Sequence, residues 1–389
     1  MTYFDWNATA PLLDEARDAW LRASESAWAN PSVAYRVGVQ ARLELDEARD
    51  WLAAQFCVGP EQVIFTSGAT EASNGFVRES ARRTGPNGEI WISAVEHPAV
   101  RATALEYWGE GRVRQIPVQP SGELDLDWLE SRMKTHRPSL VCVMAVNNET
   151  GVIQPWQAVA ELCRVHRVAY FCDAVQWMGK RELAGQPWAH CAGVALSGHK
   201  FGGPKGIGCL ILGPEWSGMK IQAGGSQEFA SRSGTENIAG VVSMVAALRQ
   251  RMTCPSPEAL QTARDGFEQK LLELWDDAVT IHGAGAQRVW NTCSVALPGF
   301  PSNRWIARLD RRGFQISAGS ACSTGKAGPS PVLTAMSIPD EVARRTVRIS
   351  GGWETRPEDW QALFVALKEV HGELEEPGKL DGPGRIIQI

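Results

Sequence analysis

The sequence predicts an α/β protein built on an open, mostly parallel sheet, followed by a second, smaller α+β domain. Up to about residue 212, short apolar runs that end in polar residues alternate with helical patterns, which is typical of such a sheet. Beyond residue 254 the pattern changes to longer helical stretches and a few short strands. The length of 389 residues and the 44% hydrophobic content also favour two domains, each with its own core.

Composition excludes several classes of partner. The net charge is -5 and no long basic stretch occurs, so we expect no nucleic-acid partner. Nine cysteines without a Cys-x-x-Cys pair argue against a disulfide framework or a structural zinc site, and indicate a reducing, cytoplasmic location. The N-terminus does not resemble a signal peptide, and the longest near-apolar run, 238–248, is shorter than the ~20 residues of a membrane helix. We therefore expect no membrane association.

The order of the predicted elements follows from apolar periodicity and from the turn residues between them. Asp14 is expected to cap the first helix, and Asn30-Pro31 to end it. The helices are expected at residues 14–28, 42–56, 70–82, 156–167, 237–252 and 258–276, and the strands at 63–65, 89–94, 140–146, 168–172, 194–196, 207–212, 293–297, 314–318 and 346–349. A hinge at 254–257 would separate a large domain of residues 15–253 from a small domain of residues 1–14 and 254–389.

A turn of small residues joins the strand at 63–65 to the helix that follows it. It reads Thr66-Ser67-Gly68-Ala69-Thr70-Glu71. Free backbone N–H groups and the positive end of a helix dipole make such a turn an anion site, most often for phosphate. Ordinary capping of the helix by Ser67 or Thr70 is the alternative.

Polar side chains also follow the other expected strands of the sheet, namely His97, Asn148 and Asp173. Because the carboxyl ends of parallel strands share one edge of a sheet, these side chains should meet at a ligand site. Each of them alone is a weak signal, since a lone histidine after a strand is usually structural or solvated.

The segment Ser197-Gly198-His199-Lys200 lies between two apolar, strand-like runs and is followed by a glycine-rich turn. A lysine held between core strands is partly desolvated, which favours the neutral amine that a Schiff-base lysine needs. A phosphate loop would require Ser or Thr after Gly-Lys, whereas Gly206 follows Lys205. A loop lysine without a role is the remaining alternative.

Cys322 lies in the second domain, among the small residues of Ser317-Ala318-Gly319-Ser320-Ala321-Cys322-Ser323-Thr324-Gly325-Lys326. A buried structural cysteine would have apolar neighbours, as Cys142, Cys172 and Cys209 have in their strand-like runs. We therefore expect a reactive, accessible thiol at Cys322, with a chance position in a surface loop as the alternative.

A lysine, a strand-end carboxylate and a phosphate turn together meet the needs of pyridoxal phosphate. Lys200 would bind this cofactor through a Schiff base, and the carboxylate of Asp173 would pair with the protonated pyridine nitrogen. His97 could stack on the face of the ring. The phosphate would be held by Gly68, Ala69 and Thr70.

The chain resembles the cysteine desulfurases of the iron–sulfur and nitrogen-fixation type, which have the class V aminotransferase fold. The resemblance covers residues 3–353. It rests on Thr66-Ser67-Gly68-Ala69-Thr70-Glu71, Glu96-His97, Val146-Asn147-Asn148-Glu149, Asp173-Ala174-Val175-Gln176, Ser197-Gly198-His199-Lys200, Arg232-Ser233-Gly234-Thr235, Ser320-Ala321-Cys322 and Val347-Arg348-Ile349-Ser350. It implies the fold type I of pyridoxal-phosphate enzymes, with a mostly parallel seven-stranded sheet in the large domain.

The resemblance also implies roles for single residues. Lys200 would move the substrate's α-proton, and the thiolate of Cys322 would attack the sulfur of the bound L-cysteine. The products would be L-alanine and a persulfide, which an iron–sulfur scaffold or a thiolation protein would accept. The remaining roles would be phosphate contacts by Thr70, Ser197, His199 and, from the neighbouring subunit of a homodimer, Thr235; ring contacts by His97, Asp173 and Gln176; and binding of the substrate carboxylate by Asn148 and Arg348.

Three segments depart from the family pattern. Ala10 stands where a second threonine is usual, Gly351-Gly352-Trp353 replaces a Leu-Gly-Arg-like continuation, and the last residues do not resemble a scaffold-docking tail. These departures affect the expected partner more than the chemistry. The alternatives are a selenocysteine lyase, another class V lyase or aminotransferase, and a sulfur-transfer scaffold without catalysis.

Overall fold

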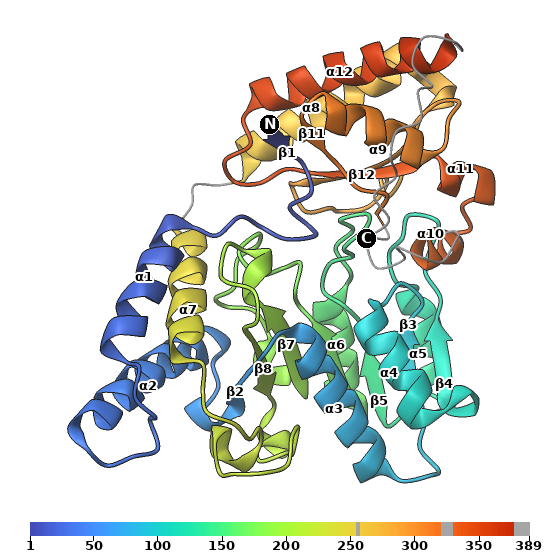
Figure 1. Ribbon diagram of the computed structural model, residues 1–389. Helices are drawn as coiled ribbons and strands as arrows, with labels where there is room; N and C mark the ends of the chain where they lie inside the picture. Colours follow the sequence, from blue (N-terminus) through green and yellow to red (C-terminus); the bar gives the residue numbers. More distant parts are fainter. Residues whose placement is uncertain (254–256, 320–329, 377–389) are drawn as a thin grey trace.

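The computed structural model describes residues 1–253, 257–319 and 330–376, whose elements form two groups (Figure 1). A seven-stranded sheet with helices on both faces makes up the larger group. A three-stranded sheet with its own helices makes up the other, and it faces one end of the large sheet. This is the α/β architecture that the sequence predicts.

The seven-stranded sheet has the strand order β2-β8-β7-β6-β5-β3-β4. β8 runs antiparallel to both of its neighbours, while the other neighbouring strands pair in parallel. The strands are β2 (Val63–Thr66), β3 (Ile90–Ser93), β4 (Val113–Ile116), β5 (Leu140–Cys142), β6 (Ala169–Asp173), β7 (Gly193–Ser197) and β8 (Gly208–Leu212). The predicted mostly parallel, seven-stranded sheet is confirmed.

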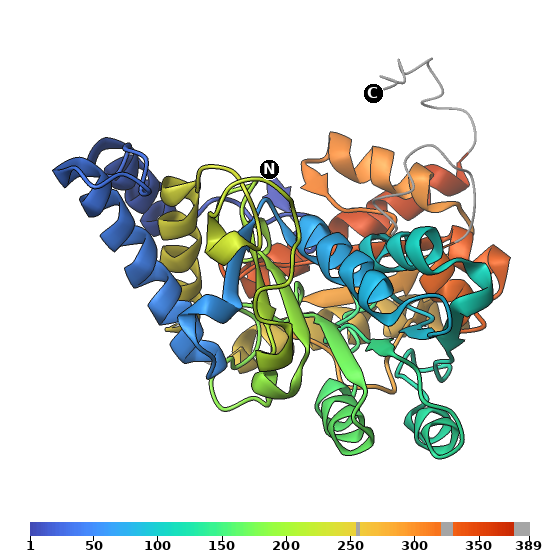
Figure 2. The same cartoon turned by 90° about the horizontal axis from the view of Figure 1, so that it is seen from below.

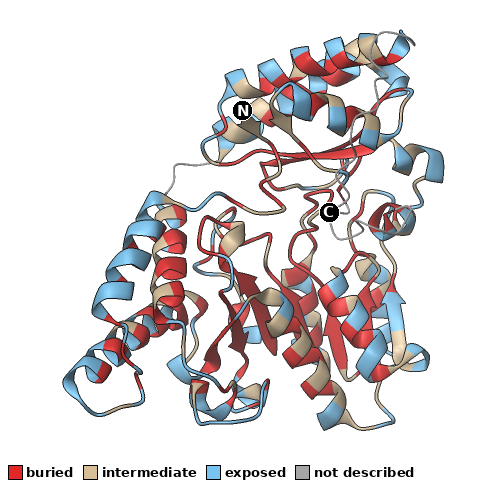
Figure 3. Cartoon of the chain, viewed as in Figure 1, coloured by how far each residue is buried: buried red, intermediate tan, exposed pale blue. Residues whose placement is uncertain are grey.

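Helices cover both faces of this sheet, so its central strands are buried (Figures 2 and 3). Side chains alternate along each strand: Ile64 packs on one face, and Val63 and Phe65 on the other. The first face is covered by α3 (Ala69–Thr84) and α4 (Pro98–Trp108). The second is covered by α2 (Arg36–Phe56), α5 (Leu126–Met133), α6 (Trp156–His166) and α7 (Ile238–Met252), with α1 (Asp14–Ser26) packed on α7.

The second group is built around β10 (Thr292–Ala296), which pairs antiparallel with β9 (Thr280–Ile281) and β12 (Thr346–Ser350). Its other elements are β11 (Phe314–Gln315), α8 (Glu258–Trp275), α9 (Ser302–Arg311), α10 (Pro331–Ala335), α11 (Asp340–Arg344) and α12 (Pro357–Glu375). The N-terminal strand β1 (Thr2–Tyr3) pairs with β11, and Phe4 packs in the same hydrophobic cluster as Trp305. The division into two domains stays a prediction, which this clustering supports.

Two predicted boundaries near the N-terminus are wrong. Asp14 does not cap α1; it is the first helical residue, and its carboxylate pairs with Arg17 at 2.9 Å. α2 begins at Arg36 instead of residue 42. The sequence pattern missed its first turns because the residues buried there are the small Gly38 and Ala41, which do not form an apolar stripe.

Two strands are shorter than predicted. β5 ends at Cys142, but Val143 and Ala145 still donate backbone hydrogen bonds to Phe171 and Asp173, so the chain continues beside β6 without regular pairing. β11 covers only Phe314–Gln315 of the expected residues 314–318. Helices α4, α9, α10, α11 and α12 and strand β4 were not predicted. In α4 the buried side chains are mostly small, as at Ala99 and Ala104, which weakens the amphipathic pattern.

In the described ranges, no helix has the length and apolar character needed to span a membrane. Within the same ranges, no group of three or more His, Cys, Asp or Glu side chains is placed to hold a metal ion. The seven cysteines described are free, and Cys57 alone among them is exposed.

Candidate active site

A cavity of about 940 Å³ lies where the carboxyl ends of the parallel strands face the second group. This is the size range of cofactor and ligand sites. The predicted site residues that line it are Gly68, Ala69, Thr70, His97, Asn148, Asp173, Gln176, Ser197, His199, Lys200 and Arg348. The fold thus brings together residues that are up to 280 positions apart in the sequence.

The phosphate turn predicted at residues 66–71 forms one end of this cavity. α3 begins at Ala69, and its N-cap, Gly68, has no side chain that could compete with a ligand for the first N–H groups. β8 approaches the turn so closely that a Cβ on Gly208 would lie 2.6 Å from the Cα of Gly68. Ser197 Oγ lies 3.6 Å from the point that a Cβ on Gly68 would occupy. The turn therefore offers backbone and hydroxyl donors at a positive helix end.

His199 stands next to this turn as a neutral imidazole. Its Nδ1 lies 3.1 Å from Thr9 Oγ1. Burial, with the positive charges of Lys200 and Lys205, lowers the pKa of His199 to about 4. The ring therefore contributes hydrogen bonds to the site without adding a charge near neutral pH.

Lys200 is the last residue of a 3-10 turn (Gly198–Lys200) between β7 and β8. The turn is closed by backbone bonds from Gly198 N to Ile207 O and from Gly203 N to Gly198 O. Lys200 Nζ donates to the carbonyls of Asn7 and Ala8, each at 2.8 Å. The N-terminal loop thus holds the amine at the cavity wall.

Asp173 and His97 line the same cavity from different strand ends. One carboxylate oxygen of Asp173 accepts from Val175 N at 3.0 Å. Burial raises the pKa of Asp173, while the neighbouring His97 and Lys200 oppose that shift. His97 caps α4 by accepting from Ala99 N with Nδ1 at 3.1 Å, which places the proton of its neutral form on Nε2.

Glu96 is a second buried carboxyl in this wall. Its Oε1 accepts from Met144 N at 2.6 Å, and Oε2 has no hydrogen-bond partner among the described residues. Burial, followed by the charge of Asp173, raises the pKa of Glu96 well above its ordinary value. Burial therefore disfavours a charge on Glu96.

Arg348 reaches the cavity from β12, in the second group. Its guanidinium donates to the carbonyls of Asn148 at 3.0 Å and Gly319 at 3.2 Å, and forms an ion pair of 2.6 Å with Asp5. The side chain is buried, and its Nε has no hydrogen-bond partner in the described part of the chain. A buried guanidinium with a spare N–H is suited to a ligand carboxylate.

Two predicted residues are not among those that line the cavity. Thr235 is exposed on the segment that precedes α7. Cys322 lies outside the described residues, so its position relative to Lys200 stays a prediction.

The structure adds residues that the sequence analysis did not single out, namely Asp5, Asn7, Thr9, Glu96 and Lys180. Asp5, Asn7 and Thr9 lie in the loop after β1. This loop is far in sequence from the strand-end segments on which the site prediction was based. Lys180 could have been found from its position four residues after Gln176. Its amine donates a hydrogen bond to the side-chain oxygen of Gln176.

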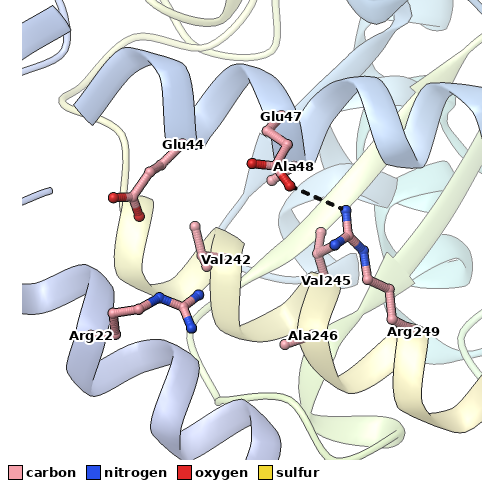
Figure 4. Close-up of a pocket in the computed structure, with 8 residues that line it drawn as sticks. All are labelled: Arg22, Glu44, Glu47, Ala48, Val242, Val245, Ala246 and Arg249. Atoms are coloured by element: carbon pink, nitrogen blue, oxygen red, sulfur yellow. Dashed lines mark ion pairs between the residues drawn. The ribbon is translucent and has the colours of Figure 1, made fainter. Parts of the chain in front are cut away.

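A smaller cavity of about 230 Å³ lies between α1, α2 and α7 (Figure 4). Glu47 and Arg249 form an ion pair of 3.8 Å across its wall. Its remaining lining consists of Arg22, Glu44, Ala48, Val242, Val245 and Ala246. None of the predicted site residues is among them, so the large cavity is the candidate active site.

Comparison with known proteins agrees with this geometry. Residues 2–363 match the family model described as Aminotransferase class-V. The chain therefore belongs to the class-V aminotransferase family, whose members depend on pyridoxal phosphate.

Within this family the chain is a homologue of cysteine desulfurases. A cysteine desulfurase of Klebsiella pneumoniae is 35% identical over 95% of this chain and 92% of its own. A selenocysteine lyase of Xenopus laevis is 33% identical over 95% of this chain and 94% of its own. A solved structure described as a NifS-like protein aligns with a TM-score of 0.86 at 27% identity, over 96% of this chain and 99% of that one.

Proposed function

We propose that this protein is a pyridoxal-phosphate-dependent cysteine desulfurase, which converts L-cysteine to L-alanine and holds the sulfur as a persulfide on Cys322. The observation that carries the proposal is the convergence of Lys200, Asp173 and His97 on one cavity beside a phosphate turn. The desulfurase relatives support the choice of substrate.

The residues of the cavity fit pyridoxal phosphate. The uncapped start of α3, with Thr70, Ser197 and neutral His199, suits the phosphate group. Buried Asp173 suits a protonated pyridine nitrogen, because a cation beside it would offset the cost of burying its charge. Gln176 suits the ring hydroxyl and His97 the ring face. When bound, the cofactor supplies an acceptor for the electron pair released at the substrate's Cα.

Lys200 would hold the cofactor covalently through Nζ and, once the substrate amine has displaced it, would carry the proton taken from the substrate's Cα. Asn7 O and Ala8 O are positioned to hold the displaced amine, since they accept hydrogen bonds from it at 2.8 Å. Arg348, with Asn148, would fix the substrate carboxylate. The ion pair with Asp5 keeps the guanidinium in place.

Cys322 would complete the reaction as a thiolate. Its sulfur attacks the sulfur of the bound cysteine, an S–S bond forms, and the Cβ–S bond breaks with its electron pair left on carbon. A proton then adds at Cβ, which yields alanine and a persulfide on Cys322. Substrate carbon is reduced while the two sulfurs are oxidised, so no outside oxidant or reductant is needed.

Partners are part of the same proposal. We infer a homodimer in which the exposed Thr235 contacts the phosphate in the neighbouring subunit, and a sulfur-acceptor protein that takes the persulfide sulfur. Selenocysteine lyase activity is the second candidate, because a relative with that name covers the chain as fully as the desulfurases do.

Alanine formation from cysteine tests the proposal, with Cys322→Ser compared against Cys57→Ser. Cys57 is the exposed cysteine in the described part of the chain and lies at the C-cap of α2, so it controls for loss of any accessible thiol. Cys322→Ser should bind the cofactor yet form almost no alanine, and the added sulfur in the wild type should map to Cys322. Wild-type alanine formation by Cys322→Ser would reject the desulfurase mechanism. Turnover of selenocysteine alone would favour the lyase.

A further inference from the structure

A second lysine is buried beside the loop that holds Lys200. Lys180 ends the turn that follows β6, and its side chain is only 3% exposed. Its Nζ donates to Asn7 Oδ1 at 2.7 Å and to Gln176 Oε1. Both acceptors are neutral amide oxygens, and the reaction proposed above does not use this amine.

The amine of Lys180 acts as a pair of hydrogen-bond donors. Burial lowers the pKa of Lys180 well below its ordinary value, and the positive charges of Lys200 and Arg348 act in the same direction. The amine carries at least two N–H bonds in either protonation state, and Asn7 and Gln176 supply acceptors for two of them. The group is thus satisfied without a counter-charge.

A donor at this position decides how both amides are oriented. The oxygen ends of Asn7 and Gln176 must face Lys180, so their NH₂ ends point elsewhere. Gln176 Nε2 donates to Asn7 O at 2.9 Å, along the cavity wall. Asn7 Nδ2 donates to Thr292 Oγ1 at 2.9 Å and to Asn148 O at 3.2 Å. If the amides turned over, these bonds would be lost.

Asn7 also connects Lys180 with Lys200 through hydrogen bonds. Its carbonyl accepts from Lys200 Nζ, and its Oδ1 also accepts from Asn291 Nδ2 at 3.0 Å. We propose that Lys180 is a positioning residue, whose amine locks Asn7 and Gln176 so that Gln176 presents an N–H group to the cofactor's ring oxygen and Asn7 O stays against Lys200. This inference rests on the proposed function, because it places the cofactor in this cavity.

Binding of pyridoxal phosphate to the cofactor-free full chain tests the inference, followed by absorbance and by the visible circular dichroism of the bound cofactor. Lys180→Met removes both donors and should weaken binding about tenfold, as expected for the loss of one or two hydrogen bonds. It should also about halve the circular dichroism per bound cofactor, because the ring is held less rigidly. Lys180→Gln, whose NH₂ group keeps two N–H donors, should recover most of both signals.

A matched control and a double variant separate positioning from general destabilisation. Arg181→Met removes an exposed cation one residue later, which contacts the ring of Trp177, and should bind the cofactor like the wild type. Because Lys180 acts partly through Gln176, the double variant Lys180→Met/Gln176→Ala should lose less binding free energy than the sum of the two single losses. If Lys180→Met does not fold, Lys180→Leu takes its place.

Additive losses in the double variant, unchanged binding by Lys180→Met, or a Lys180→Gln variant as weak as Lys180→Met would each overturn the inference. These outcomes require that the wild type binds the cofactor. A wild type that binds no pyridoxal phosphate would instead reject the proposed function itself, and this inference with it.

Discussion

Asp173 and Glu96 are two buried carboxyls on one wall of the cavity, and burial raises the pKa of both. Asp173 is 7% exposed and Glu96 5%. The proposed function places the charge on Asp173, so Asp173→Asn removes a charge that a pyridinium nitrogen would need, whereas Glu96→Gln should change little. Both substitutions keep the size of the side chain, and both keep an oxygen that can accept the backbone bond from Val175 or Met144.

The size of the Asp173→Asn effect follows from this burial. An opposite charge within 4–6 Å shifts a pKa by about 1–3 units, and each unit corresponds to about 1.4 kcal/mol. The dry surroundings of Asp173 favour the upper half of that range, or about 3–4 kcal/mol. If this stabilisation acts in the transition state, the rate should fall about 100- to 1000-fold.

The assay is alanine release from cysteine at saturating cofactor, with thermal unfolding of each variant as the control for folding. Glu96→Gln should stay within about threefold of the wild type. Asp173→Asn within that same range would mean that Asp173 does not pair with the ring nitrogen. An equally large loss in both variants would refute the assignment of charge to Asp173 alone.

Three further outcomes are expected. Lys200→Ala should lose the covalent cofactor bond, and borohydride reduction of the wild type should label Lys200; a label on another lysine would contradict the assignment. Arg348→Lys should raise the KM for cysteine about tenfold with a smaller change in kcat, since an ammonium cannot keep the paired N–H donors; unchanged kinetics would remove Arg348 from the carboxylate site. Burial lowers the pKa of His282 to about 4, so its contribution to stability is complete above pH 6.5 and is lost as the pH falls toward 4. Between these pH values the free energy of unfolding should therefore fall less in His282→Gln than in the wild type, and equal slopes would contradict this.

The sequence by itself determined most strands of the large sheet and the edge at which the candidate site lies. Local signals were enough here, because short apolar runs bounded by turn residues, such as 194–196, are typical of buried strands, and the polar groups that follow parallel strands meet at one edge. Thus Asp173, Ser197 and Lys200 were predicted to share a site, and they line one cavity. The phosphate turn at Gly68 was also predictable, because strand, small residues and helix start follow one another in the chain.

Element boundaries were less predictable where small residues take the place of an apolar stripe. α2 begins six residues early because Gly38 and Ala41 are buried for close packing, and single-sequence periodicity does not detect such contacts. β5 ends early although the apolar run continues to Val146, because its pairing with β6 becomes irregular. Both errors arise from tertiary packing that overrides local pattern.

Only the tertiary structure decided which groups hold the side chains of the candidate site. Asn7 lies 173 residues from Lys180, 193 from Lys200 and 284 from Asn291 in the sequence. Its side-chain oxygen nevertheless accepts hydrogen bonds from Lys180 and Asn291, and its backbone carbonyl accepts one from Lys200. Arg348 meets Asp5 across 343 residues. Hydrogen bonds of this kind carry no periodic signal, because each joins two isolated polar residues whose neighbours in the chain face elsewhere. Folding the N-terminal loop between the two sheets creates these contacts, and they set the positions from which Lys200 and Gln176 would act.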